Sequence, residues 1–140
     1  MPDEALTVLV YSDNALTRER VRLALGRRPA ADLPRVEFVE VATEWAVLDR
    51  VRRGGIDLAI LDGEAVPAGG MGVCRTIKDE IFAAPPVLVL LGRPQDRWLA
   101  SWSYADGAVA HPLDPVATAD AAASLLRTGV TSGVDVSTSS

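Results

Sequence analysis

The sequence predicts an α/β fold in which five helices cover a doubly wound sheet of five parallel strands, in the order 2-1-3-4-5. Two observations predict it. Short apolar runs without polar alternation recur along the chain, which is typical of strands buried on both faces. Segments with helical periodicity separate these runs, and a regular alternation of strands and helices implies parallel crossovers.

The first strand and the first helix lie close to the N-terminus. Residues 6–11 (LTVLVY) are almost continuously apolar, and the polar residues 12–14 end the run. A helix is predicted over residues 15–25, and Gly26 is a suitable stop for it.

The second strand and helix follow a loop that contains two prolines. Residues 36–41 (VEFVEV) are rich in β-branched side chains, which favour a strand. A helix is predicted over residues 43–53, with Thr43 as its N-cap. We expect Trp45, Leu48 and Val51 to face the core from this helix.

The third strand leads into the loop that matters most for function. Residues 56–61 (IDLAIL) form an apolar strand that ends at Asp62. A loop rich in glycine follows over residues 63–70, and the next helix is predicted over residues 71–81.

The last third of the chain repeats the pattern and then loses its apolar residues. Strands are predicted over residues 87–91 and 107–110, with a helix over residues 95–106 between them. A final helix is predicted over residues 115–127, with proline in its first turn. Residues 129–140 have little to bury, and we expect a disordered tail there.

Composition fits one domain over residues 1–128 and excludes several classes of protein. The chain has 140 residues, of which 49% are hydrophobic and 24% charged, as in an ordinary globular domain. No apolar run approaches the roughly 18 residues of a membrane span, and the N-terminus is acidic, so we expect a cytoplasmic protein. The formal net charge of −5 argues against nucleic-acid binding. The single cysteine, Cys74, cannot form an internal disulfide, and we expect it to be a small buried side chain.

Acidic residues follow two strands that should be neighbours in the sheet. In such folds ligands bind beyond the carboxyl ends of the strands, near the switch point between the first and third strands. Asp13 follows the first of these strands and Asp62 the second. Two carboxylates placed together could bind Mg²⁺. Alternatively, Asp13 caps the first helix and Asp62 is an ordinary turn residue.

Several segments together resemble the receiver domain of two-component response regulators. They are VLVYSDN, LAILDGE, VLVLLGRP and GAVAHPLDP, with Gly70 eight residues after Asp62. The resemblance covers about residues 6–128, and the pattern is similar to the atypical single-domain regulators of actinobacteria. It implies a flavodoxin-like receiver fold.

The resemblance implies that Asp62 is the phosphoacceptor. The acidic pair that the family carries after the first strand falls on Ser12 and Asp13, so a hydroxyl replaces one carboxylate. Glu64 could partly replace the lost ligand, which leaves Asp13, Asp62 and Glu64 as a weakened Mg²⁺ site.

Other positions of the family's site are also altered here. The hydroxyl that contacts phosphate falls on Leu91, which cannot hydrogen-bond, and the mobile aromatic falls on Ala108. The family's lysine falls on His111, which could instead be a simple loop residue, and Lys78, the only lysine of the chain, lies on another helix. Arg93 could reach an anion or belong to a solvated loop. The resemblance therefore implies a degenerate site.

The resemblance also implies a signalling role. A stand-alone receiver would bind a sensor histidine kinase or another signalling protein and would at most phosphorylate itself once from a phosphodonor, without being an enzyme. Its output would be a protein contact, including a homodimer, through the face of the fourth helix, fifth strand and fifth helix. Trp98, Trp102 and Tyr104 are candidates for that face, although one tryptophan could belong to the core. The alternative is a phosphorylation-independent pseudo-receiver that acts as a scaffold or dimerisation module.

Overall fold

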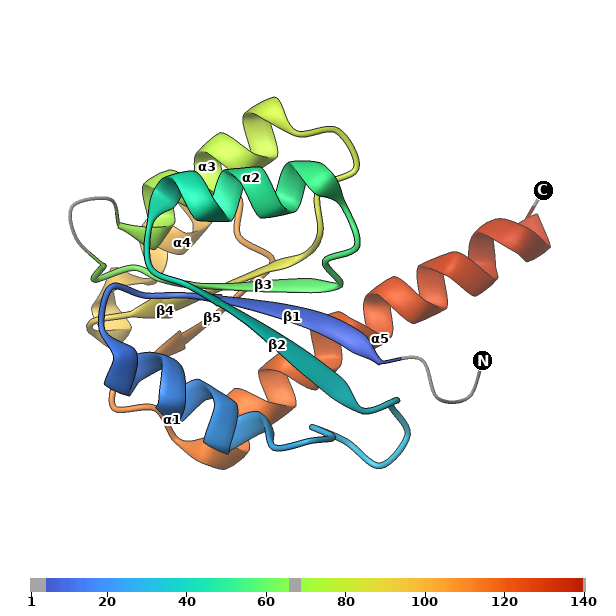
Figure 1. Ribbon diagram of the computed structural model, residues 1–140, viewed down its shortest axis with the longest axis horizontal. Helices are drawn as coiled ribbons and strands as arrows, with labels where there is room; N and C mark the ends of the chain where they lie inside the picture. Colours follow the sequence, from blue (N-terminus) through green and yellow to red (C-terminus); the bar gives the residue numbers. More distant parts are fainter. Residues whose placement is uncertain (1–4, 66–68, 140) are drawn as a thin grey trace.

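The computed structural model describes residues 5–65 and 69–139, with side chains described as far as Thr128 (Figure 1). The strands are β1 (Leu6–Tyr11), β2 (Val36–Val41), β3 (Leu58–Asp62), β4 (Val87–Leu91) and β5 (Gly107–Ala110). Within the described residues they form one parallel sheet in the order β2-β1-β3-β4-β5. The predicted fold class and strand order are confirmed.

Helices cover both faces of this sheet. The helices are α1 (Ala15–Leu25), α2 (Glu44–Arg53), α3 (Gly70–Glu80), α4 (Arg97–Trp102) and α5 (Pro115–Ser139), with a short 3₁₀ turn at Pro94–Asp96 before α4. Helices α1 and α5 lie on one face, and α2, α3 and α4 lie on the other (Figure 1). Every side chain of β3 and β4 is buried, because these central strands are covered from both sides.

Side chains at the start of several helices satisfy free backbone donors. The Asn14 side chain accepts a hydrogen bond from the Leu16 N–H at 2.9 Å, and Thr43 accepts one from the Ala46 N–H at 3.2 Å. The prediction for Thr43 is confirmed. The alternative that Asp13 caps the first helix is wrong, since Asn14 does so.

Helix α4 ends four residues before the predicted end of its segment at residue 106. The chain turns at Tyr104, whose φ of 64° is left-handed, and the N–H groups of Tyr104 and Ala105 bond back to the carbonyls of Ser101 and Ala100, each at 3.1 Å. This helix ending normally uses glycine at the left-handed position. Because tyrosine stands there instead, the sequence carried no stop signal.

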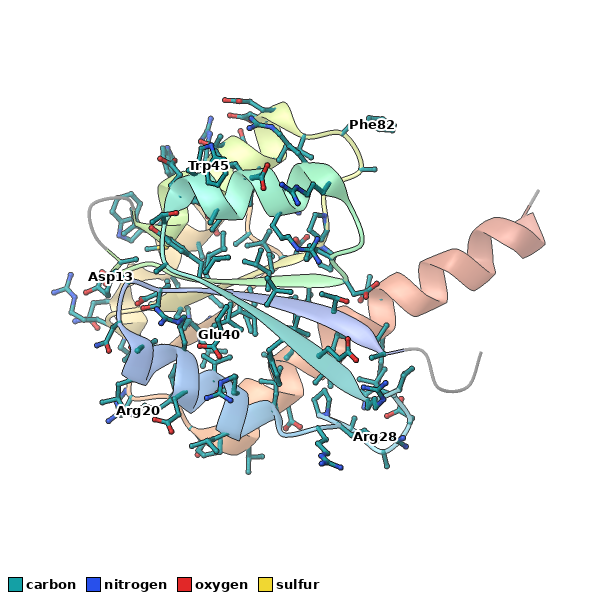
Figure 2. All side chains as sticks on the ribbon, in the orientation of Figure 1. Asp13, Arg20, Arg28, Glu40, Trp45 and Phe82 are labelled. Carbon is teal, nitrogen blue, oxygen red and sulfur yellow. The ribbon has the colours of Figure 1, made fainter. Side chains whose placement is uncertain are left out.

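Helix α2 turns two of the three predicted residues, Leu48 and Val51, towards the core, but not Trp45. Trp45 is 73% exposed (Figure 2), whereas Val47 and Val51 are buried and Leu48 packs against them. Residues two positions apart in an α-helix point to opposite sides, so Trp45 and Val47 cannot share the core face. The prediction that Trp45 points inward is wrong.

Some predicted features lie beyond what the structure describes. Residues 66–68 of the predicted loop are outside the described residues. Helix α5 continues from the predicted region to Ser139, but the side chains after Thr128 and all of Ser140 are outside the description. The disordered tail at residues 129–140 therefore stays a prediction. Among the described helices, none combines the length and apolarity that crossing a membrane requires.

Cys74 is fully buried on α3, as predicted, and its thiol lies 3.3 Å from the Ser103 carbonyl oxygen. Burial raises the pKa of this thiol from 9.0 to about 11. The hydrogen bond to Ser103 lowers the pKa, but by less than burial raises it. The thiol therefore loses its proton at lower pH in the unfolded chain than in the folded one.

We expect this difference to appear as a loss of stability in alkali. The contribution of Cys74 is fully present below pH 9 and is lost as the pH rises towards 11, by about 1–2 kcal/mol. Denaturant unfolding measured across this range checks it. The difference between the wild type and Cys74→Ala should change with pH by this amount, and a constant difference would contradict the prediction.

Candidate functional site

The carboxyl ends of the strands meet at one edge of the sheet. Tyr11 pairs with Leu61 across β1 and β3, and the Gly63 N–H donates to the Leu90 carbonyl at 2.9 Å. The His111 N–H likewise donates to the Leu91 carbonyl at 2.8 Å. The parallel register therefore brings the ends of β1, β3, β4 and β5 to the same edge.

Asp62 ends β3 with both carboxylate oxygens hydrogen-bonded, although the residue is only 4% exposed. Its Oδ2 accepts a bond from the Ser12 hydroxyl at 2.7 Å, and its Oδ1 accepts one from the Glu64 N–H at 2.9 Å. Ser12 Oγ in turn accepts a bond from the Asn14 N–H at 3.0 Å. A buried carboxylate needs such partners, and here the chain itself provides them.

The other two acidic candidates are arranged differently. Asp13 is exposed at the end of β1 (Figure 2). The Glu64 carboxylate is turned towards Gly92, where a Cβ would come within 2.5 Å of Glu64 Oε1. Gly92 therefore leaves room for Glu64 to lie across the start of the loop after β4.

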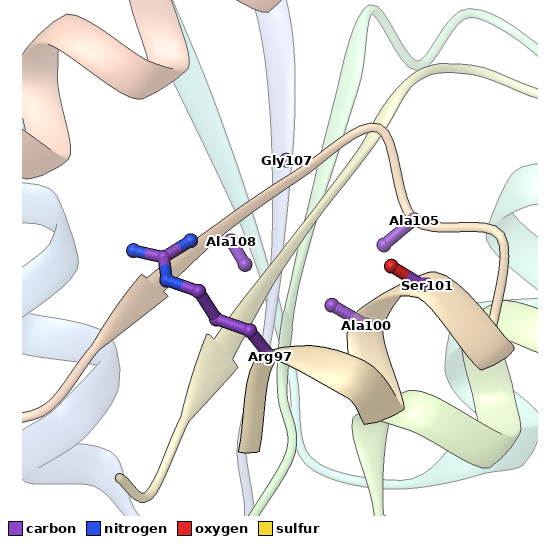
Figure 3. A pocket seen from close by; sticks show the side chains of 6 residues that line it. All are labelled: Arg97, Ala100, Ser101, Ala105, Gly107 and Ala108. Carbon is purple, nitrogen blue, oxygen red and sulfur yellow. The ribbon is translucent and has the colours of Figure 1, made fainter. Parts of the chain in front are cut away.

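Leu91 is fully buried at the end of β4 and belongs to the core under α2, α3 and α4. Ala108, on the neighbouring strand, lines a pocket of about 240 Å³ between α4 and β5 (Figure 3). The pocket is lined by Arg97, Ala100, Ser101, Ala105, Gly107 and Ala108. Neither position places a polar side chain beside Asp62.

The cationic candidates are distributed over the molecule. Arg93 is exposed and pairs with Asp96 at 3.0 Å, and the hydrogen bond and charge of Asp96 raise the pKa of the Arg93 guanidinium. Lys78 pairs with Asp106 at 2.7 Å, just before β5, which is the opposite end of the sheet. Lys78 therefore cannot act at the Asp62 edge.

Sequence reasoning missed Tyr11 as a member of this edge. The residue is buried, and burial raises the pKa of its hydroxyl. The negative charges of Glu44, Asp13 and Asp62 raise it further, in that order. The Tyr11 hydroxyl therefore faces the same acidic corner. The sequence could have indicated this, because Tyr11 is the last residue of the apolar run 6–11 and so lies at the carboxyl end of β1.

Comparison with curated proteins supports an assignment. Two proteins of Mycobacterium tuberculosis, from strains CDC 1551 and H37Rv, are each 59% identical to the chain over 129 residues, which is 91% of the chain and 97% of each relative. Both bear the name uncharacterized response regulatory protein. The chain belongs to the response regulators. No protein-family model matches it.

Solved receiver structures share the fold. A CheY-like receiver domain protein of Methanospirillum hungatei JF-1 superposes with a TM-score of 0.70 at 14% identity, covering 92% of this response regulator and 99% of that chain. A LuxR-family two-component response regulator of Aurantimonas sp. SI85-9A1 gives 0.74 at 22% identity, covering 89% and 87%. Response regulators are signalling proteins that interact with histidine kinases or other signalling proteins, and receiver domains are generally not enzymes.

Receiver domains typically bind Mg²⁺ at their phosphorylation site. We therefore asked whether the predicted ligand residues could hold this ion. Among the described residues, no group of three or more Asp, Glu, His or Cys side chains could hold a metal. Asp13, Asp62 and Glu64 are thus not brought together as the ligand set that the sequence predicts. Glu64 therefore does not replace the carboxylate that Ser12 lacks.

Proposed function

We propose that this response regulator is a stand-alone receiver module that signals by protein contact and has Asp62 as its candidate phosphoacceptor in a degenerate site. The position of Asp62 supports this proposal. Its carboxylate ends the central strand β3, at the edge where ligands of such folds bind. We expect the protein to work in the cytoplasm and without nucleic acid, in keeping with its net charge of −5.

In the phosphoacceptor role, an Asp62 oxygen would attack the phosphorus of a donor. The bond that breaks would join phosphorus to an oxygen in acetyl phosphate and to an imidazole nitrogen in a phosphohistidine. The acyl phosphate would form once per protein molecule. The Ser12 hydroxyl would have to release Oδ2 or donate to the new group. Leu91 offers the phosphoryl group no hydrogen bond, and the half-buried His111 stands where the resemblance implies a lysine.

The second candidate is a phosphorylation-independent pseudo-receiver that acts as a scaffold or dimerisation module. The observation that favours it is the hydrogen bonding of Asp62, whose oxygens are both engaged by the chain. Ala108 adds to this, because a methyl group cannot move between two positions as an aromatic ring can.

Mass spectrometry separates these two candidates. The protein is incubated with Mg²⁺ and acetyl phosphate, and its intact mass is measured. An added phosphoryl group that Asp62→Asn removes, and that the exposed control Asp57→Asn leaves in place, supports the phosphoacceptor. Failure of the mass to change with this donor and with a cognate kinase leaves the pseudo-receiver.

Aromatic side chains around α4 support output by protein contact. Trp98, Trp102 and Tyr104 are 66%, 49% and 54% exposed, so neither tryptophan belongs to the core and the expectation that one does is wrong. Arg75, from α3, lies 4.8 Å from the Trp102 ring and 4.6 Å from the Tyr104 ring. Exposed tryptophan, tyrosine and arginine are the residues most often found at binding hot spots. We therefore propose this aromatic surface as the partner face.

Sedimentation tests the homodimer form of that proposal. If the protein dimerises through the aromatic surface, Trp98→Ala and Trp102→Ala should weaken the dimer severalfold. Trp45→Ala, at a tryptophan on α2 that is more exposed still, is the control and should leave it unchanged. Equal effects of all three substitutions would argue against the aromatic surface as the dimer face.

Arg75→Ala should also lower the stability of the protein. Two cation–π contacts at exposed sites contribute about 0.5–1 kcal/mol each, and Arg75 also donates to the Trp102 carbonyl at 2.8 Å. We expect a loss of about 1–2 kcal/mol in urea unfolding, with a shift in tryptophan emission. Arg52→Ala, which breaks only an exposed 3.5 Å ion pair with Glu80, should lose less than about 0.5 kcal/mol.

A further inference from the structure

We infer that the Asp62 pocket works without a divalent cation. In its place the hydroxyl of Ser12, a positioning residue, donates a hydrogen bond to the Asp62 carboxylate. The inference rests on the proposed role of Asp62 as the centre of the site. It concerns what holds that carboxylate, and it applies whether or not the carboxylate is ever phosphorylated.

The direction of the Ser12 hydrogen bond follows from its neighbours. Ser12 is fully buried, and its Oγ already accepts a bond from the Asn14 N–H at 3.0 Å. The hydroxyl proton is therefore free to be donated, and the acceptor within reach is Asp62 Oδ2 at 2.7 Å. Hydrogen bonds to a charged acceptor are shorter and stronger than neutral ones, and this bond has the length of that class.

The backbone of Ser12 is held as firmly as its side chain. Arg18 Nη1 donates to the Ser12 carbonyl at 2.6 Å, and the same guanidinium pairs with Glu40 at 3.1 Å. The Arg18 side chain is only 17% exposed. The hydroxyl is thus attached to a backbone position that α1 and β2 both restrain.

Within the described residues, no group of three acidic side chains gathers around Asp62 to hold a hard cation. Mg²⁺ requires nearly ideal octahedral geometry and is usually bound through one or two carboxylates with several waters. Glu64 points to Gly92 and Asp13 is exposed, which leaves Asp62 with a neutral hydroxyl where the family has a second carboxylate. Restoring that carboxylate should restore cation binding.

The test compares the wild type with Ser12→Asp and with Ser12→Asn. The asparagine variant is the control, because its side chain has the shape of aspartate but no charge. Each protein is melted with MgCl₂ and with NaCl of equal ionic strength. We expect the wild type and Ser12→Asn to melt at the same temperature in both salts. Ser12→Asp should be less stable in NaCl, because the new carboxylate then lies beside that of Asp62, and it should regain stability in MgCl₂.

Mn²⁺ titration followed by amide NMR locates any binding. In Ser12→Asp, saturable broadening should be confined to residues around positions 12–13 and 62–64. The inference is overturned if the wild type shows that same saturable broadening, lost in Asp62→Asn. It is also overturned if Ser12→Asp folds and gains no cation binding. Should Ser12→Asp fail to fold, the wild-type titration decides by itself. No phosphodonor is present, so the outcome is independent of whether Asp62 accepts a phosphoryl group.

Discussion

Replacing Ser12 with alanine is expected to destabilise the folded protein by about 2–3 kcal/mol. The substitution removes the donor to Asp62 Oδ2 and the acceptor of the Asn14 N–H in one step. A buried carboxylate oxygen then lacks a partner, and the desolvation of such a group is not recovered elsewhere. Urea unfolding followed by tryptophan fluorescence measures the change. Ser101→Ala, on the exposed side of α4, is the matched control and should stay within about 0.5 kcal/mol.

A double-mutant cycle with Asp62→Ala isolates the pair from other effects of the substitution. Once Asp62 is absent, loss of the Ser12 hydroxyl leaves no charged group unpaired, so the second substitution should have a much smaller effect. We expect a coupling energy of about 1.5–3 kcal/mol, as for hydrogen bonds to charged groups. Additive effects would mean that Ser12 does not hold Asp62.

Leu91→Thr should destabilise the protein by about 2–4 kcal/mol, even though it supplies the hydroxyl that the resemblance implies for this position. Leu91 is fully buried and packs with the core under α4. Threonine removes apolar volume there and introduces a hydroxyl that must find a partner in a hydrophobic setting. Denaturant unfolding measures the loss.

Leu23→Thr is the control for that substitution, since Leu23 is 75% exposed on α1 and the change there should stay near zero. A Leu91→Thr protein as stable as the wild type would show that the end of β4 is not packed as the structure describes. If the loss is observed, one substitution cannot return this site to the usual receiver pattern. Its neighbours in the core would have to change as well.

The candidate site was predictable in its location and less so in its bonding. The ends of β1 and β3 could be assigned from the sequence because uninterrupted apolar runs stop at residues 12–14 and at Asp62. Parallel pairing then places both ends at one edge. The role of Ser12 as donor to Asp62 was not predictable, because it depends on which way a hydroxyl turns. The hydrogen bond of Asn14 to Ser12 decides that direction.

The surface around α4 was also predictable only in part from the sequence. The sequence marked Trp98 and Trp102 as unusual, but periodicity could not reveal that both are exposed. Their environment depends on where α4 ends, and the left-handed turn at Tyr104 ends it without a glycine. Arg75 reaches these rings from α3, an element that precedes them by a strand and a loop, so spacing along the chain carried no sign of the contact.

The sequence by itself determined the sheet, its strand order and the edge where the acidic residues gather. The sheet and its edge follow from apolar periodicity and the handedness of parallel crossovers, which are properties of local segments. The strand order is the one expected of flavodoxin-like doubly wound folds. Only the tertiary structure decided which groups satisfy Asp62, because its partner Ser12 lies 50 residues away. Hydrogen bonds between distant segments depend on ångström-scale placement of two strand ends, and no pattern along the chain encodes that distance.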